Sequence, residues 1–164
     1  MFNFLRRLFV VKEIRSKKGE LHFVRYRVLS SPFFSIYIHY IAKSDEDLHP
    51  HSHPWDYTSI ILAGGYEEEL WDYKNCEYYD FRPLNSQNTC GTCRIKWKPI
   101  SKIYKRFSIV NGCHYNYHKL TLLKPTWSLV FTGSRKKHGG SDWGYLVDNE
   151  HVEHEKYRKN KNNA

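Results

Sequence analysis

The sequence predicts an all-β protein, folded as an antiparallel sandwich or barrel. Short segments rich in β-branched and aromatic residues recur along the chain, and glycine and proline turn signals separate them at close intervals. Helical periodicity is expected only in the first dozen residues and at 44–47. Many short strands with tight connections are typical of sandwiches and barrels.

The strands are predicted from alternation and composition. Residues 21–29 read LHFVRYRVL, an alternation typical of a half-buried strand. Gly64-Gly65 predicts a turn between two strands, and Lys124-Pro125-Thr126 predicts a second one. The expected strands are residues 21–29, 33–42, 57–63, 66–73, 94–97, 106–110, 118–123, 127–132 and 143–147.

Length and charge limit the organisation and the partners. The 164 residues fit one domain, with an N-terminal extension at 1–20, the barrel at 21–148 and a polar, flexible tail at 149–164. A formal charge of +9 allows a weak anionic partner. No apolar run approaches the ~18 residues of a membrane helix, and no secretory signal is recognisable. We therefore expect a cytoplasmic protein without a membrane partner.

The strongest chemical signal is a group of histidines. Three of the ten histidines fall at 49, 51 and 53. Residues two apart in a strand face the same side, so His51 and His53 can form half of a metal site. His118, at the start of HKLTLL, is the best third ligand, with His114 as the alternative. Three ligands leave open positions, which is typical of a catalytic metal rather than a structural one.

Several motifs resemble the cupin superfamily. HSHPW at 51–55 is followed by GGY at 64–66, and the second half carries YH at 117–118 and WGY at 143–145. Over roughly residues 22–147, this order resembles a family of small uncharacterised phage and bacterial cupin-like proteins. The resemblance implies a cupin barrel, also called a double-stranded β-helix or jelly roll, and a possible homodimer. It implies no particular reaction.

One feature departs from the usual cupin motif. A glutamate normally follows the second histidine, but Tyr57 and Thr58 occupy its possible positions here. The remaining three-histidine set is similar to that of cysteine dioxygenase-type cupins, which implies a divalent metal, iron for a dioxygenase. Zinc, nickel and manganese remain open because the imidazole ligands do not select the metal.

Other residues are candidates for the pocket. Glu68 shares a strand face with Tyr66 and could act as an acid or base, although a solvated edge is the simpler interpretation. Arg135 follows a strand end and could clamp a carboxylate or phosphate. Asp56 could orient a ligand imidazole or cap a turn. The residues expected to contact substrate are Tyr37, His39 and Trp127.

The cysteines offer a competing metal site. Cys90 and Cys93 have the two-residue spacing of a zinc knuckle or redox pair. Cys76, with Cys113 or His114, could complete a structural zinc site. Because only one such pair occurs, unrelated thiols near a hairpin tip are the simpler interpretation.

Three functions follow. The first is a small metalloenzyme of dioxygenase type, acting on a small polar substrate inside the barrel. The second is a non-catalytic module that binds a sugar, a nucleotide or a nucleic-acid phosphate. The third is a metal-independent sugar-nucleotide isomerase or epimerase. A phosphate-binding glycine loop and a serine-hydrolase elbow are absent from the sequence.

Overall fold

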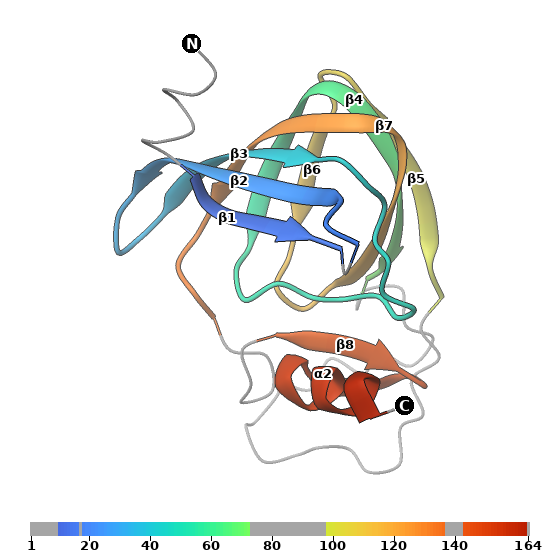
Figure 1. Cartoon of the computed structure of the whole chain (residues 1–164). Helices are drawn as coiled ribbons and strands as arrows, with labels where there is room; N and C mark the ends of the chain where they lie inside the picture. The colour runs from blue at the N-terminus through green and yellow to red at the C-terminus, as the bar shows by residue number, and fades with distance from the viewer. Residues whose placement is uncertain (1–9, 17, 73–97, 137–142, 164) are drawn as a thin grey trace.

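The computed structural model describes residues 10–16, 18–72, 98–136 and 143–163 (Figure 1). Almost all of the regular structure in these ranges is β. The elements are β1 (Val10–Arg15), β2 (Leu21–Ser30), β3 (Ser35–Ile41), β4 (Tyr57–Trp71), β5 (Ile100–Lys105), β6 (Ile109–Gly112), β7 (Tyr117–Thr132), β8 (Gly144–Val147), β9 (Glu150–Glu153) and α2 (His154–Asn163).

Seven strands form one antiparallel sheet that curls upon itself. Its order is β1-β2-β3-β7-β4-β5, and β6 pairs with β4. The first half of β4 pairs with β6 and the second half with β5. Figure 1 shows β4 and β7 arching over one end of the molecule, with β8 and α2 at the other end. The predicted all-β fold class, an antiparallel barrel, is confirmed.

The two predicted turns inside this sheet are wrong. Gly64-Gly65 lies within β4, and Lys124-Pro125-Thr126 lies within β7. Both segments are sharp bends of continuous strands, marked by three register shifts in the β4–β7 pairing. A barrel strand must change direction to close the sheet, and bulges and glycines provide that change. Turn-forming residues therefore mark corners of the barrel here rather than hairpin ends.

The inside of the barrel holds both a small core and a cavity. Ile61, Tyr66 and Val110 form the buried core cluster. Beside it lies a cavity of about 400 Å³, lined by residues of β1, β2, β3, β4 and β7 and by the segment between β3 and β4. Because strand residues alternate between faces, the lining residues of β3 and of the second half of β7 lie two apart, as His39 and Ile41 and as Ser128 and Val130.

The C-terminal elements differ from the flexible tail expected from the sequence. Residues 150–153 pair with β8, and 154–163 form α2. Tyr157 of α2 stacks on Tyr145 at 3.8 Å between ring centres, and Lys161 pairs with Asp47 at 2.7 Å. Aromatic contacts and this ion pair order a segment whose composition alone suggested none.

Other elements also differ from those predicted from the sequence. Residues 10–12 belong to β1 rather than to a helical turn, and the described segment at 44–47 is not helical. The strand β5 was not predicted. The strand expected at 94–97 lies outside the described residues. In the described part of the chain, no helix is long and apolar enough to cross a membrane.

Candidate metal centre

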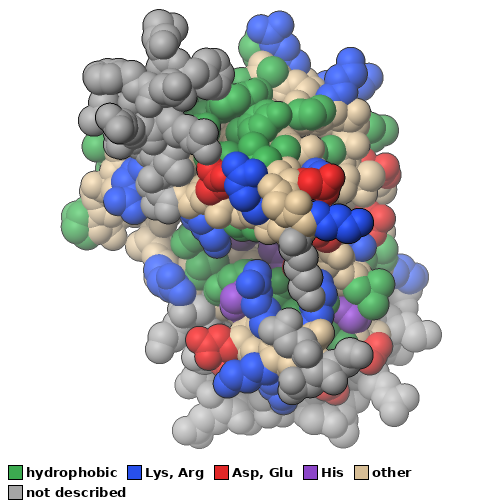
Figure 2. Space-filling model, viewed as in Figure 1, with side chains coloured by type: hydrophobic (Ala, Val, Ile, Leu, Met, Phe, Trp, Pro, Cys, Tyr) green, Lys and Arg blue, Asp and Glu red, His purple; other side chains and the backbone are tan. Residues whose placement is uncertain are grey.

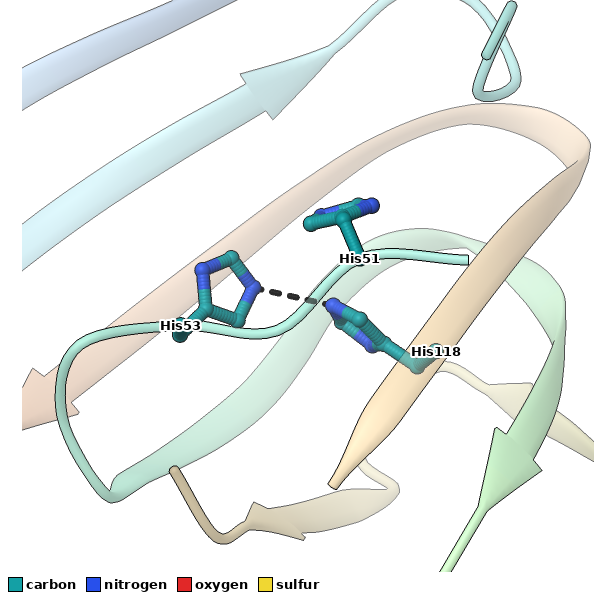
Figure 3. A group of neighbouring side chains, drawn as sticks. All are labelled: His51, His53 and His118. Carbon is teal, nitrogen blue, oxygen red and sulfur yellow. Dashed lines mark hydrogen bonds between the residues drawn. The ribbon is translucent and has the colours of Figure 1, made fainter. Parts of the chain in front are cut away.

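The loop before β4 places two of the histidines. His51 lies beside the start of β7, where its N–H donates to the His118 carbonyl at 2.9 Å and its carbonyl accepts from the His118 N–H at 2.9 Å. The next residue, Ser52, donates its N–H to the Gly144 carbonyl of β8 at 2.9 Å. Backbone bonds on both sides thus fix the loop. His51 and His53 point to the same side, as predicted, although the segment is not a regular strand (Figure 3).

Three imidazoles meet in this place. His51, His53 and His118 each offer a ring nitrogen, and these nitrogens all lie within 4.8 Å of one another. Figure 3 shows the rings converging, with a hydrogen bond between His53 and His118. This bond joins His53 Nε2 and His118 Nε2, which are 2.9 Å apart. The structure therefore brings His118, rather than the alternative His114, to the pair.

The donor set fits a divalent metal. Imidazole nitrogens bind such ions at about 2.1 Å, so two of them at a right angle lie about 3 Å apart. The His53–His118 nitrogen separation of 2.9 Å agrees with that value. The three histidines thus form a candidate metal site.

Burial keeps two of the ligands neutral. Burial, and then the neighbouring His118, lower the pKa of His51 to about 4. Burial lowers the pKa of His53 well below its ordinary value, with further contributions from His118 and His51. Only a neutral imidazole has a lone pair for a metal, so both residues are prepared to bind one near neutral pH.

The third ligand is oriented by a buried carboxylate. His118 Nδ1 lies 2.6 Å from Glu68 Oε1, and Glu68 is only 2% exposed. Burial alone lowers the pKa of His118, but the Glu68 hydrogen bond and charge outweigh it and raise this pKa. Because Nδ1 faces Glu68, Nε2 is left to face His53. Glu68 was predicted as an acid or base; the structure places it behind His118.

The cavity next to the histidines contains some of the residues predicted to bind substrate. His39 and Arg135 both line it. Tyr37 lies beside His39, with ring centres 5.9 Å apart. Trp127 is not among the cavity-lining residues. It neighbours the cavity-lining Ser128, and alternation turns its ring to the outer face of the sheet. There it stacks on Tyr26 and packs against Tyr40 at a tilt, so the expectation that it lines the pocket is corrected.

A cation in the cavity was missed by the sequence analysis. Arg25 of β2 lines the cavity, and its Nε donates to His39 Nε2 at 3.1 Å. Arg25 and Arg27 both interrupt the same apolar strand. Local sequence offers no signal that distinguishes them, because only barrel closure decides that Arg25 lines the cavity.

The alternative ligand His114 belongs to a second cluster. Its Nδ1 lies 2.6 Å from Asp56 Oδ1, and its backbone N–H donates to the same oxygen at 2.9 Å. Asp56 therefore does orient an imidazole, but that of His114. Cys113 lies beside it, with the sulfur 3.8 Å from His114 Nδ1, and burial raises the pKa of this thiol. Asp56 also pairs with Lys136, whose positive charge opposes a cation at this cluster.

The zinc site proposed for the cysteines falls largely outside the described residues. Cys76, Cys90 and Cys93 all lie there. Cys113 is half-buried and forms no disulfide. The choice between zinc and unrelated thiols stays a prediction.

Comparison with known proteins finds structural likeness only. No family model and no curated protein matches the sequence. Among solved structures, KdgF from Halomonas sp. is similar with a TM-score of 0.46 and 13% identity, over 78% of this chain and 94% of that one. A conserved SPY1581 protein of unknown function from Streptococcus pyogenes has a TM-score of 0.45 and 11% identity, over 75% and 81% of the two chains.

A third similar structure is hydroxypropylphosphonic acid epoxidase from S. wedmorenis. The TM-score is 0.45 at 11% identity, over 74% of this chain and 55% of the epoxidase. This chain thus spans about half the length of the epoxidase. Identities this low carry no information about activity. The resemblance of the sequence to a particular phage and bacterial family stays a prediction.

Proposed function

We propose that this protein is a small metalloenzyme that binds a divalent ion through His51, His53 and His118 and acts on a small polar substrate in the barrel. The observation that carries the proposal is the convergence of three ring nitrogens at the wall of a cavity of about 400 Å³. Pockets of this size are typical of small-molecule sites. Iron is the metal we favour, in a cytoplasmic oxidoreductase of dioxygenase type.

The residues around such a site have different roles: some bind the metal, some orient its ligands and some contact the substrate. A bound divalent ion supplies Lewis acidity, and iron(II) adds the ability to react with dioxygen. Three protein ligands leave positions for substrate. Glu68 holds His118 in one orientation, and the backbone bonds of His51 and Ser52 hold the loop. We assign substrate contact to His39 and Arg135, because both line the cavity.

Metal content tests the proposal. Protein purified without an affinity tag or added metal should hold close to one equivalent of a transition metal, measured by elemental mass spectrometry. The His51→Ala/His53→Ala double variant should hold almost none. His49→Ala is the matched control, since His49 lies in the same segment but contacts Tyr157 instead of the triad. Metal that persists in the double variant would assign it to other residues, such as the cysteines.

A second function is favoured by the His118–Glu68 pair. A histidine hydrogen-bonded to a buried carboxylate at 2.6 Å is also the arrangement for proton transfer without a metal. This supports the sugar-nucleotide isomerase or epimerase alternative. Turnover of a candidate sugar nucleotide that survives complete metal removal would favour it over the metalloenzyme.

A further inference from the structure

The side chain of Arg25 is enclosed by aromatic rings on the cavity wall. Its guanidinium carbon lies 4.9 Å from the ring centre of Tyr37, 5.6 Å from that of Trp55 and 5.7 Å from that of Phe23. Such contacts hold a guanidinium in place through the ring quadrupole but provide no negative charge. The rings therefore fix the direction of the side chain without neutralising it.

The hydrogen bond of Arg25 leaves most of its donors unused. An arginine can only donate, so His39 Nε2 accepts from Arg25 Nε and the His39 ring keeps its proton on Nδ1. The two terminal nitrogens of Arg25 have no partner among the described residues. No carboxylate of the described residues forms an ion pair with this guanidinium. A cation drawn out of water without a counter-charge is costly.

The surroundings add positive charge instead of removing it. Lys12 and Arg135 line the same cavity, whereas Asp45 is the single carboxylate residue among the lining residues that the structure describes. Asp45 already accepts from the Leu120 N–H at 2.8 Å and lies 3.8 Å from His51 Nδ1. Figure 2 shows Lys and Arg side chains around the recess between the barrel and the C-terminal elements, with Asp and Glu side chains also on its barrel edge. Among the described lining residues, three are thus cationic and one is anionic.

Arg25 lies close to the histidine triad. Trp55 connects the two, because its ring stacks on His53 at 6.3 Å between centres and also contacts the Arg25 guanidinium. A small molecule with a group at Arg25 therefore extends toward the imidazoles within the same cavity.

We propose that Arg25 forms an oxyanion subsite, so that the substrate is a small anion whose carboxylate or phosphoryl group binds Arg25 while the rest of the molecule faces the three histidines. The terminal nitrogens provide a planar fork for two oxygens, and Lys12 and Arg135 add long-range attraction. The position of the reacting end rests on the proposed metal function. The subsite itself does not.

Binding of simple probes to the metal-free protein tests this proposal. A metal ion would itself attract carboxylates, so its removal isolates Arg25; the chelator is then removed by gel filtration because it is also an anion. Propionate, methylphosphonate and neutral propionamide are titrated and followed by ligand-observed NMR. We expect one or both anions to bind, and propionamide to bind at least about 10-fold more weakly.

Variants assign the binding to the residue. Arg25→Gln should weaken anion binding about 10- to 100-fold, and Arg25→Lys should retain part of it because the charge remains but the fork is lost. Arg27→Gln is the matched control. It removes an exposed cation two residues along β2 that does not line the cavity. Its anion binding should equal that of the original protein.

The outcomes are distinct. Tighter binding of propionate assigns a carboxylate substrate, and tighter binding of methylphosphonate a phosphoryl one. No anion binding, equal binding of propionamide, or unchanged binding in Arg25→Gln overturns the proposal. The comparison of propionate with propionamide needs no variant, so it holds even if Arg25→Gln does not fold. Failure of the metal proposal appears separately, as absent metal in the elemental measurement.

Discussion

At the scale of single residues, the pair formed by Glu68 and His118 determines whether the triad is ready for a metal. Glu68 is almost fully buried, and its carboxylate holds the His118 ring with Nε2 toward His53. Partners that orient ligating histidines typically account for 10- to 100-fold in metal affinity. Glu68→Gln retains an oxygen acceptor but loses the charge, so we expect metal affinity to fall by about 10-fold or more.

Competition with a coloured chelator measures this loss. Glu69→Gln is the control, because Glu69 is exposed and points to the opposite face of β4. Equal affinities of the two variants would show that Glu68 does not position the ligand. A melting temperature is recorded in parallel, since a general loss of folding would lower the affinity of Glu68→Gln for a different reason.

The residue scale also shows how far sequence reasoning reaches into the site. His51 and His53 could be paired because their spacing is local. Glu68 could be singled out because it alternates with its neighbours. The contacts of Asp56 could not be assigned, since His114 lies far along the chain and only the fold brings them together. Arg25 was missed for the same reason.

At the scale of elements, the bend of β4 is required for barrel closure. Gly64 has a φ of 83°, which side chains rarely adopt, and a Cβ there would meet the Pro125 carbonyl at 2.4 Å. Thr126 holds the bend by accepting from the Gly65 N–H at 2.8 Å. Gly64→Ala should therefore lower the free energy of unfolding by more than the about 1–2 kcal/mol of left-handed backbone alone.

Urea denaturation checks this value, with Gly133→Ala as its control. Gly133 has no positive φ, and among the described residues a Cβ there would meet only the Asp56 carbonyl, at 3.8 Å. If both variants unfold at the same urea concentration, the bend does not depend on glycine at 64. The result bears directly on the corrected turn prediction, since a simple surface turn would tolerate the alanine better than a packed corner.

Elements were predictable where their signal was local. Alternation in β2 and the β-branched and aromatic content of β3 located both strands. The continuity of β4 and β7 was not predictable, because glycine and proline signals indicate a change of direction and do not tell a bend from a turn. The helix α2 was not predicted because the contacts that hold it are made with distant residues, such as Asp47 and Tyr145.

At the scale of the whole molecule, the barrel encloses several imidazoles whose charge it does not tolerate. Burial, together with the nearby Arg25, lowers the pKa of His39 to about 3, compared with an ordinary value of 6.5. His51 and His53 are shifted in the same direction. Because these pKa values are lowered by folding, the histidines bind protons in the unfolded chain at pH values where they stay neutral in the folded protein. The stability from each such group is present above pH 6.5 and is lost as the pH falls below it.

The metal-free protein should therefore become less stable between pH 6.5 and pH 5. His39 tests this without touching a proposed metal ligand. His39→Gln removes one histidine that is protonated only in the unfolded chain, while the glutamine amide oxygen can still accept a hydrogen bond from Arg25. From linkage, the original protein should lose about 2 kcal/mol more than His39→Gln between pH 7 and pH 5. Urea titrations at the two pH values measure the difference. Equal losses of stability in the two proteins would mean that His39 becomes protonated in the folded barrel. Burial and the nearby Arg25 would then not keep the His39 ring neutral.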